Sequence, residues 1–335
     1  MGDRDQRRDR TLDRTVAVEA VQRAMATCRA AQGRLSAGET IIKGDLSPVT
    51  IADLAAQAVV NATVAAVAGD DFAMVAEEDP DTVRADPVIA SAVADLASVG
   101  LGHEVHGTQI PGLLGLGGGE TRSPGRSRFW TLDPIDGTKG FIRGDQYAVA
   151  LALIVDGEVV LGALGCPNLP GPDGSIGALL IADDHGCEII DDTGSNPAVV
   201  HAPASVRDAR FCESVEAAHS DQTLSARIAE LLGIRTEAYR IDSQCKYAAV
   251  ARGDASIYLR LPTHPDYREN IWDHAAGAIA VERAGGRVTD VHGRRLDFSC
   301  GVRLEHNHGI VATDGRFHDE VIDAIGVALA EAHRR

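Results

Sequence analysis

Hydrophobic residues recur with helical spacing through the first part of the chain. Residues 11–31 are rich in Ala and Val at that spacing and predict a helix after a charged start. The stretch SPVTIADLAAQAVVNATVAAVAG combines a helix-start signal with an apolar body, and it predicts a second helix that ends near Gly69. Residues 80–128 are less regular. Their last part, IPGLLGLGGGETRSPGRSR, is rich in Gly, Pro and Arg and predicts a surface loop.

Shorter apolar runs predict strands. FAMVAEED indicates a buried strand that runs into acidic residues, and RFWTLDP indicates a strand that ends in another acidic motif. The segment YAVALALIVDGEVVLGALGCP has two apolar runs joined by Asp156-Gly157, which predicts a hairpin, and ALLIADDHGCEII repeats the pattern around His185-Gly186. Beyond residue 200, strands and helices alternate, and IWDHAAGAIAVERAGG predicts a helix closed by two glycines.

This succession of hairpins and alternating helices predicts an α/β protein with two packed, sheet-containing halves. A chain of 335 residues is long for one ordinary core, so the pattern favours either two domains or one large layered body. We place the division at residue 195, with an α+β half over residues 1–195 and an α/β half over residues 196–335.

The composition limits the classes of partner. A formal net charge of −17 argues against a nucleic-acid polymer, because phosphate backbones are bound by basic surfaces, but a small phosphate ester could still be held through metal ions. No apolar stretch resembles a signal peptide, and the longest apolar run, residues 148–155, is too short to span a bilayer. The cysteines are far apart, which favours reduced thiols in the cytoplasm over disulfides or zinc: Cys28, Cys166, Cys187, Cys212, Cys245 and Cys300.

Carboxylates stand at four places where a strand is predicted to end or a helix to begin, and each has a structural alternative. Asp53 follows Thr50 at the spacing of a capping box. Glu77 could belong to a solvated acidic turn. The motif LDPIDGTKGF, with Asp133 and Asp136, could be an ordinary turn, because Asp, Pro and Gly favour turns. Asp273 precedes an apolar helix, where its charge would offset the helix dipole.

Taken together, these acids favour a metal site. If the strand ends and helix starts converge, Glu77, Asp133, Asp136 and Asp273 would share a small volume. Two like charges about 4 Å apart cost about 4 kcal/mol at an effective dielectric constant of about 20, so divalent cations would be needed there. Oxygen ligands favour Mg²⁺ over Zn²⁺, and about two or three ions would balance four carboxylates and a phosphate. Such a site suits phosphoryl transfer to water.

The residues after the second aspartate fit this chemistry. The backbone amides of Gly137 and Thr138 could hold phosphate oxygens without an intervening side chain. The Thr138 hydroxyl could hydrogen-bond to Asp53, and the two together could orient and deprotonate the attacking water.

Three motifs resemble those of the lithium-sensitive, magnesium-dependent phosphatases of the inositol monophosphatase superfamily. They are Glu77-Glu78 after a strand, the segment Asp-Pro-Ile-Asp-Gly-Thr at residues 133–138, and Trp272-Asp273, in the family's order. The resemblance covers residues 12–315 and is weakest over 80–128. It implies a sugar-phosphatase fold with alternating layers of helices and two mixed sheets. It also implies that Glu77, Asp133, Asp136, Asp273 and the Ile135 carbonyl bind metal, with Asp53 and Thr138 activating water.

Within the superfamily, the sequence is similar to the 3'(2'),5'-bisphosphate nucleotidases. The central motif continues as KGFIRGDQY, where inositol monophosphatases usually have Thr-Asn-Phe, and KGDLSPVTIAD, IDSQCKYAAVARGDASIYLRLP and IWDHAAGAIAVERAGG are also similar. The resemblance implies that His219, Ser243, Lys246 and Arg260 hold the nucleotide and its 5'-phosphate, in keeping with the need for a cationic cradle. Without the family, Lys246 could be a solvated helix residue and Arg260 a charge at a strand edge.

Two departures from the family pattern concern single positions. The residue before Glu77 is Ala76, where the family more often has glycine, so the turn there is expected to differ slightly. The segment around His219 reads VEAAHSDQT and is shorter than the family's His-Ser-Ser-His pattern.

The resulting hypothesis is a cytoplasmic, Mg²⁺-dependent phosphatase that converts 3'-phosphoadenosine 5'-phosphate to AMP and phosphate, with 3'-phosphoadenylyl sulfate as a further possible substrate. The resemblance also implies lithium inhibition and a place in sulfur metabolism. The expected partner is a small nucleotide bisphosphate, with no membrane and no nucleic-acid polymer, and the expected state is a monomer or weak homodimer. The alternatives are an inositol phosphate or fructose bisphosphate phosphatase, and a non-catalytic sensor of nucleotide or metal. The Gly-rich stretch 112–119 lacks the spacing of a phosphate-binding loop.

Overall fold

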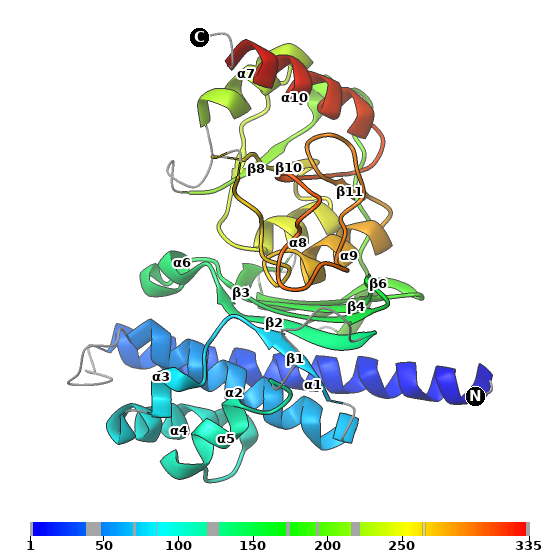
Figure 1. The fold of residues 1–335 in the computed structure, drawn as a ribbon. Helices are drawn as coiled ribbons and strands as arrows, with labels where there is room; N and C mark the ends of the chain where they lie inside the picture. Colours follow the sequence, from blue (N-terminus) through cyan, green and yellow to red (C-terminus); the bar gives the residue numbers. More distant parts are fainter. Residues whose placement is uncertain are drawn as a thin grey trace.

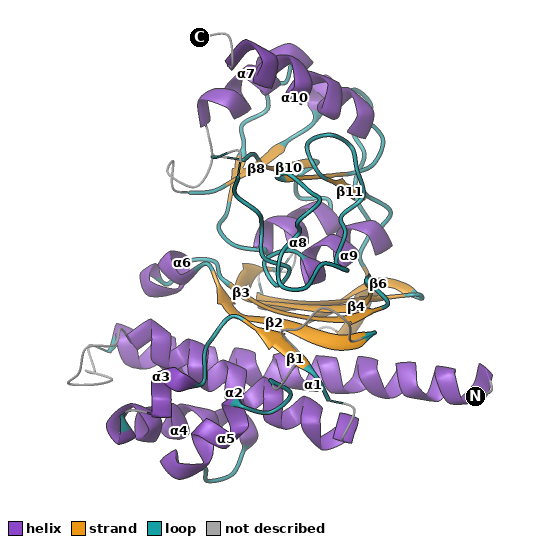
Figure 2. Ribbon diagram, viewed as in Figure 1, coloured by secondary structure: helices purple, strands orange, loops and turns teal. Residues whose placement is uncertain are grey.

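Helices and sheets alternate in layers through the molecule, as the sequence predicts (Figure 1, Figure 2). The computed structural model describes residues 3–37, 48–69, 72–84, 86–118, 127–171, 175–191, 194–215, 222–262, 264 and 266–332. In these ranges the layers run from a helical layer at the N-terminal side, through a sheet, a pair of helices and a second sheet, to a final helical layer near the C-terminus.

The first layer is built from long helices. Helix α2 is the described helix whose length and apolar composition would suffice to cross a membrane, but most of it is buried inside the protein. Its apolar side chains pack against α1, α4 and strand β2, so internal packing accounts for its composition. The helical elements of this layer are α1 (Asp3–Ser36), α2 (Pro48–Ala68), α3 (Asp81–Arg84), α4 (Pro87–Leu101), η2 (Gly107–Gln109) and α5 (Ile110–Leu114).

Helix α5 corrects one prediction. The Gly- and Pro-rich stretch that begins at residue 110 was expected to be a surface loop, but Ile110 and Leu114 are buried in the helical layer. The carbonyl of Gly117 then accepts a hydrogen bond from the amide of Met74 at 3.0 Å. A Cβ on Gly117 would lie 2.7 Å from the Phe72 ring, so a glycine is needed for this close approach. The later residues of the stretch, 119–126, lie outside the described ranges.

The N-terminal sheet follows the sequence order of its strands. Strand β1 is parallel to β2, and each later pair is antiparallel, which makes the sheet mixed. The hairpin at Asp156-Gly157 is confirmed, with φ of 51° and 80° at its two residues. The next turn is centred one residue earlier than predicted, on Asp184-His185. The strands are β1 (Met74–Ala76), β2 (Arg128–Asp136), β3 (Ala148–Val155), β4 (Glu158–Pro170), β5 (Ile176–Asp183), β6 (Gly186–Asp191) and β7 (Gly194–Pro197).

Strand β3 shows how this sheet serves two cores. Its larger residues, Val149, Leu151 and Leu153, belong to the core shared with α1, α2 and α4. Its alternate residues, mostly alanine, face the opposite core shared with α8 (Cys245–Ala251) and α9 (Ala275–Arg283). On neighbouring β4, a Cβ on Gly162 would lie 2.4 Å from a methyl of Ile279. The small residues on this face therefore let α9 approach the sheet closely.

The C-terminal sheet lies on the other side of α8 and α9. Its strands run in the order β11-β12-β10-β8-β9, with parallel and antiparallel neighbours, so it too is mixed. A third core on its outer face packs against α7 and α10. These elements are β8 (Phe211–Glu213), β9 (Tyr239–Arg240), β10 (Ile257–Arg260), β11 (Arg287–Thr289), β12 (Ile310–Thr313), α7 (Gln222–Leu232) and α10 (His318–Ala332), with η4 (Val206–Asp208) before β8 and α6 (Thr138–Arg143) after β2. The division at residue 195 stays a prediction.

All six cysteines fall within the described ranges and form no disulfide there, as the sequence predicts. Five of them are buried and Cys300 is partly exposed. Burial raises the pKa of Cys187 to about 12 and raises the pKa of Cys28 well above its ordinary value, so these thiols stay protonated and act as small core residues.

Candidate active site

The acidic motif after residue 132 is the end of a strand, and its interpretation as a simple turn is wrong. Asp133 pairs with Ala150 of β3, and Asp136 pairs with Ala148, so the three steps along β2 oppose two steps along β3. Pro134 lies at this register shift and has no N–H to donate to the ladder. The extra residue is a β-bulge, and it places both aspartates at the same end of the sheet.

The Gly137-Thr138 pair joins this strand to helix α6. Gly137 has φ of +90°, a conformation that favours glycine, and a Cβ there would lie 2.8 Å from the Cβ of Ser243. Ser243 itself has φ of 64°, which is uncommon for a residue with a side chain. Gly137 and Ser243, which both have unusual backbone conformations, are thus in contact. This contact places the start of α6 next to the start of α8. Thr138 begins α6, so its amide is among those without an intrahelical acceptor.

Asp53 and Glu77 lie near the two aspartates of β2. Asp53 belongs to helix α2, and Glu77 directly follows β1. Asp53 lies inside α2, which already includes Pro48, so the capping-box alternative with Thr50 is wrong. Glu77 follows β1, and its amide donates to the carbonyl of Leu132 at 3.2 Å. Next to it, the Gln57 side chain holds the Glu78 backbone by donating to the carbonyl at 2.9 Å and accepting from the amide at 3.1 Å. The acidic turn is therefore fixed against α2.

The carboxylates repel one another strongly enough to change their protonation. Burial, the charge of Asp136 and the charge of Glu77 raise the pKa of Asp133 well above its ordinary value. Burial and the charges of Glu78 and Glu77 do the same to the pKa of Asp53. Glu77 keeps contact with solvent, but lost hydration and the charges of Asp273, Glu78 and Asp136 outweigh a hydrogen bond with Asp133 and raise its pKa to about 7. These shared effects place the acids in one cluster.

This cluster has the properties of a cation site. Asp133 is 2% exposed, and its buried Oδ1 accepts no hydrogen bond within the described part of the chain. Burial and the charge of Asp273 raise the pKa of Asp136, although Lys246 and Arg260 oppose the rise. Buried carboxylates that lack partners are costly unless a counter-charge is supplied. The donor set consists of carboxylate oxygens, which suits a hard divalent ion such as Mg²⁺.

A cavity of about 340 Å³ opens beside the acids. Asp136 and Asp273 line it together with the Gly137-Thr138 pair and residues of α8, β8 and β10. The full lining is Asp136, Gly137, Thr138, Lys139, Gly140, Phe211, Cys212, Glu213, Ser214, Ser225, Asp242, Ser243, Gln244, Lys246, Tyr258, Leu259, Arg260 and Asp273. Three residues expected at a nucleotide site, Ser243, Lys246 and Arg260, therefore share one cavity with two expected metal ligands.

Lys246 is a buried residue of α8 and not a solvated helix charge. Its Nζ donates to the Ser214 hydroxyl at 3.2 Å and lies 5.4 Å from the centre of the Tyr258 ring. Burial lowers the pKa of Lys246, and the charge of Asp136 partly restores it. A cation this buried is stabilised by an anion placed next to it.

Arg260 ends β10 and belongs to a chain of polar contacts. Its Nε donates to Glu269 Oε2 at 2.8 Å, and the same oxygen lies 3.3 Å from His274 Nε2. The Nδ1 of His274 lies 2.8 Å from the hydroxyl of Tyr247. Burial alone would raise the pKa of Glu269, but His274 and Arg260 lower it below its ordinary value. The network holds the guanidinium at the cavity wall.

Gln244 is a positioning residue that the sequence analysis missed. Its amide donates to Asp136 Oδ2 at 2.5 Å, its side-chain nitrogen donates to the Trp272 carbonyl at 2.9 Å, and its side-chain oxygen accepts from the Gly277 amide at 3.3 Å. Gln244 thus connects the end of β2, the segment that carries Asp273, and α9. Neither periodicity nor a charge pattern marks this residue, since its role comes from contacts distant in sequence.

Three predicted roles lack direct support. Helices α2 and α6 are in contact, but no hydrogen bond between Asp53 and Thr138 is present in the described part of the chain, so their action as a pair stays a prediction. His219 lies outside the described residues. Ile135 lies in the bulge between the two aspartates with its side chain buried, and the role of its carbonyl as a metal ligand stays a prediction.

Comparison with protein-family models shows to which family the chain belongs. The model of the inositol monophosphatase family matches residues 12–328. The chain belongs to the inositol monophosphatase family. It is 40% identical over 347 residues to the 3'(2'),5'-bisphosphate nucleotidase of Emericella nidulans, covering 95% of this chain and 98% of the relative. It is 41% identical over 318 residues to the enzyme of the same name from Dictyostelium discoideum, covering 93% and 96%.

Solved structures confirm the fold of this inositol monophosphatase family member. The inositol monophosphatase from Anabaena (Nostoc) sp. PCC 7120 superimposes with a TM-score of 0.59 at 20% identity, covering 95% of each chain. The structure titled Mycobacterium tuberculosis SuhB gives a TM-score of 0.61 at 20% identity, covering 94% of this chain and 96% of that one. The predicted α/β layering with two mixed sheets is confirmed for the described residues. The family is metal-dependent, and the acidic cluster is consistent with that property.

Proposed function

We propose that the protein is a Mg²⁺-dependent 3'(2'),5'-bisphosphate nucleotidase that hydrolyses the 3'-phosphate of 3'-phosphoadenosine 5'-phosphate to give AMP and phosphate. One observation carries the proposal: a single cavity is lined both by the acids Asp136 and Asp273 and by the cations Lys246 and Arg260. A substrate with two phosphates can place one at the acids, through cations, and the other at the basic residues. The similarity to nucleotidases over most of the chain supports the same assignment.

In this proposal Glu77, Asp133, Asp136, Asp273 and the Ile135 carbonyl would hold about two or three Mg²⁺. When bound, the ions supply Lewis-acid activation and offset the negative charge of the transferred phosphate. The unpartnered Oδ1 of Asp133 and the raised pKa values of the cluster support this use of the acids.

The residues of the chain account for the other steps. Asp53 accepts the proton of the attacking water, and the Thr138 hydroxyl orients that water. The water oxygen bonds to phosphorus while the bond to the 3'-oxygen breaks, and the 3'-oxygen leaves with the electron pair and takes a proton from solvent water. The amides of Gly137 and Thr138 hold the phosphate oxygens. The motif at residues 133–138 offers no obvious nucleophilic side chain placed for attack, so direct attack by water is proposed, without a phosphoenzyme.

The cradle for the retained 5'-phosphate is formed by Ser243, Lys246 and Arg260. Lys246 is buried next to Ser214 and Tyr258, and Arg260 is held by Glu269, so both cations are positioned before a ligand arrives. A positioned, partly dehydrated cation binds a phosphate more tightly than a mobile surface lysine does. His219 is expected to contact the nucleotide as well. The physiological role in this proposal is removal of the nucleotide by-product of sulfate activation in the cytoplasm.

Phosphate release from 3'-phosphoadenosine 5'-phosphate with Mg²⁺ tests the proposal, with Asp136→Asn as the inactive reference. We expect turnover that is lost with a chelator and restored by Mg²⁺. The same assay with 3'-phosphoadenylyl sulfate, inositol monophosphate and fructose 1,6-bisphosphate ranks the substrates. Higher kcat/KM on either sugar phosphate would replace the nucleotidase proposal with the corresponding phosphatase. Tight nucleotide binding with no hydrolysis above the Asp136→Asn level would identify a sensor.

Lithium provides a further test of the metal site. A Li⁺ ion carries half the charge of Mg²⁺, so its presence at one of the sites is expected to slow release of the product phosphate. Inhibition that weakens as Mg²⁺ increases would support competition for the same carboxylates. Sedimentation of the purified protein tests the expected monomer or weak homodimer.

A further inference from the structure

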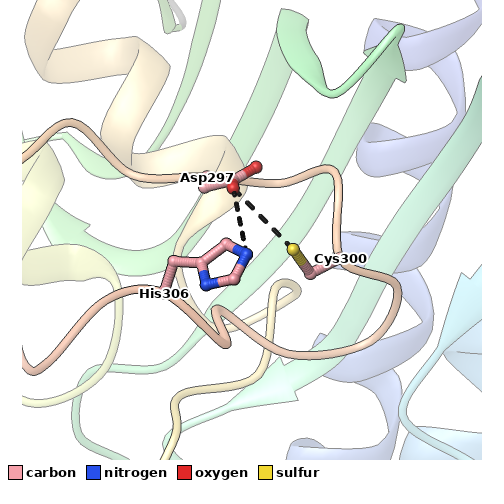
Figure 3. A group of neighbouring side chains, drawn as sticks. All are labelled: Asp297, Cys300 and His306. Carbon is pink, nitrogen blue, oxygen red and sulfur yellow. Dashed lines mark hydrogen bonds and ion pairs between the residues drawn. The ribbon is translucent and has the colours of Figure 1, made fainter.

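Three side chains with different donor atoms converge in the loop between β11 and β12, outside the acidic cluster. Asp297, Cys300 and His306 each offer one ligand atom, and these atoms all lie within 4.8 Å of one another (Figure 3). The Sγ of Cys300 is 3.7 Å from Asp297 Oδ2, and His306 Nε2 is 3.9 Å from the same oxygen. Figure 3 shows the Cys300 and His306 side chains directed toward the Asp297 carboxylate.

The Cys300 thiol donates a weak hydrogen bond to Asp297 Oδ2, and the His306 ring lies farther from the same oxygen. A nitrogen and an oxygen 3.9 Å apart are beyond hydrogen-bond distance. Metal–ligand bonds of about 2.0–2.3 Å at tetrahedral angles would put donor atoms about 3.3–3.6 Å apart. The Sγ–Oδ2 and Nε2–Oδ2 distances exceed this spacing by about 0.2–0.6 Å, and all three ligand atoms lie within 4.8 Å of one another, so rotation of the side chains would bring them into range of one ion. The other oxygen of Asp297 is already used, because Oδ1 accepts from the Ser299 amide at 2.9 Å and its hydroxyl at 2.6 Å.

The backbone of the loop is fixed in the arrangement that brings these donors together. The Asp297 amide donates to Asn307 Oδ1 at 2.8 Å, and Asn307 Nδ2 donates to the Arg295 carbonyl at 2.9 Å. These bonds link the first ligand to the residue beside the third. Gly301 has φ of +89°, which allows the chain to reverse directly after Cys300. The backbone of the site therefore needs little ordering when an ion binds.

Two other groups of potential ligands in the described ranges already have cationic partners. At the β5–β6 turn, Asp183 pairs with Arg14 at 2.7 Å and Asp184 pairs with Arg10 at 2.5 Å. Near the cavity, Glu269 pairs with Arg260. In the β11–β12 loop, by contrast, Oδ2 of Asp297 faces the thiol of Cys300 and the imidazole of His306. Both groups are themselves potential metal ligands.

We propose that Asp297, Cys300 and His306 form a Zn²⁺ site that is separate from the catalytic cluster. A thiolate and an imidazole favour Zn²⁺ over Mg²⁺, whereas the acids at the end of β2 are all oxygen donors. One carboxylate and one thiolate balance the two charges of the ion. Binding forms the sulfur–zinc bond and releases the thiol proton of Cys300 to solvent, so affinity falls as the pH falls. Water fills the fourth position of the tetrahedron.

The loop also contacts the segment that leads to the catalytic Asp273. The Ile271 amide donates to the Val302 carbonyl at 3.1 Å, and the Leu304 amide donates to the Glu269 carbonyl at 2.9 Å. Residues between Cys300 and His306 thus pair directly with the strand-like segment before Asp273. An ion that ties Cys300 to His306 holds both ends of this paired stretch and raises its resistance to local opening.

Cobalt substitution of the full-length protein tests the site. Co²⁺ is added to reduced protein saturated with Mg²⁺, because a thiolate–Co²⁺ bond gives a near-ultraviolet charge-transfer band that oxygen ligands at the catalytic cluster do not give. We expect about one such site per chain, displaced by Zn²⁺. Cys300→Ser should abolish the band, and His306→Gln should weaken Zn²⁺ affinity, measured calorimetrically, by at least about 10-fold. His103→Gln, an exposed histidine after α4, is the matched control and should bind like the wild type.

The outcomes separate the alternatives. Loss of the band in Cys300→Ser with weakened binding in His306→Gln and unchanged binding in His103→Gln supports the site. Absence of the band in the wild type, or equal Zn²⁺ affinity in wild type and His306→Gln, overturns it. Thermal unfolding of each variant with chelator present checks that folding is unchanged. The proposal does not depend on the nucleotidase activity, since every measurement is of binding or spectra.

Discussion

The acidic and the basic sides of the cavity are built in opposite ways. The basic side is complete in the protein alone: Lys246 contacts Ser214 and Tyr258, and Arg260 is bound by Glu269. On the acidic side, Asp133 keeps a buried oxygen that no described residue bonds, and its pKa is raised by burial and by the charges of its neighbours. Arg260 has a paired carboxylate and Lys246 lies near Asp136, whereas Asp133 is repelled by the acids around it.

This difference means that the acidic and the basic residues affect the free energy of folding differently. Paired cations stabilise the folded chain or leave it unaffected, whereas clustered carboxylates destabilise it until cations bind. Mutations on the acidic side should therefore change activity and metal-free stability in opposite directions. Mutations on the basic side should chiefly change substrate affinity.

The largest effect is expected for the residue assigned to accept a proton. Asp53→Asn should lower kcat by about 10²- to 10⁴-fold with a smaller change in KM, because the amide cannot take the proton of water. Steady-state phosphate release measures this. If Asp53 acts with Thr138, the Thr138→Val change should add little in the Asp53→Asn background. Fully additive effects would show that the two residues act independently.

A metal-ligand change should separate activity from stability. Asp133→Asn should lower kcat/KM by at least about 10²- to 10³-fold, because the site loses a charge that holds cations near the phosphate. The same change should raise the melting temperature in chelator by about 2 °C or more, because it removes a buried, repelled carboxylate. Asp95→Asn, an exposed change on α4, is the control for both measurements. A fall in metal-free stability would contradict the view that the acids oppose folding.

On the basic side, Lys246→Met should act through substrate affinity. KM for 3'-phosphoadenosine 5'-phosphate should rise by about 10- to 100-fold, because a buried charged hydrogen bond to phosphate is lost. KM for 3'-AMP, which has no 5'-phosphate, should stay within about threefold of the wild type. Arg287→Met, which removes an exposed ion pair with Asp319, is the control. Equal losses on both substrates would place Lys246 at the transferred phosphate instead.

The smallest effect is expected in the pH dependence of stability. The pKa of Glu77 is raised from 4.5 to about 7 in the folded protein. The stability that its protonated form contributes is therefore fully present below pH 4.5 and is lost as the pH rises through about 7. In chelator, the melting temperature should therefore fall by about 1–3 °C between pH 5 and pH 8. Saturating Mg²⁺ should remove this dependence. An equal pH dependence of the melting temperature with and without Mg²⁺ would show that Glu77 is not a metal ligand.

Sequence reasoning was most successful where a local pattern determines the structure. The hairpin at Asp156-Gly157 follows from residues that tolerate positive φ, and helix α2 follows from its apolar periodicity. The family, and with it the layered fold, followed from short motifs that carry the proposed chemistry.

Reasoning from sequence was less successful where the structure depends on distant contacts. The bulge at Pro134 requires knowledge of the register against β3, which the motif itself does not contain. Gln244 and the chain Arg260–Glu269–His274–Tyr247 act through partners from separate elements, so neither spacing nor charge marks them. Helix α5 was missed because glycine and proline suggested a loop, although Ile110 and Leu114 supply a buried face.

The alanine face of β3 has a consequence for how the active site can be altered. Helix α9 rests on that face and on Gly162, and it begins directly after the Trp272-Asp273 segment. One methyl group added at Ala150 or Ala152 would move the helix outward and take Asp273 away from Asp136. Residues that never meet the substrate can thus set the spacing between carboxylates. A change in the packing of α9 against β3 would alter the selectivity of the site among ions of different radius, although every ligand stays the same.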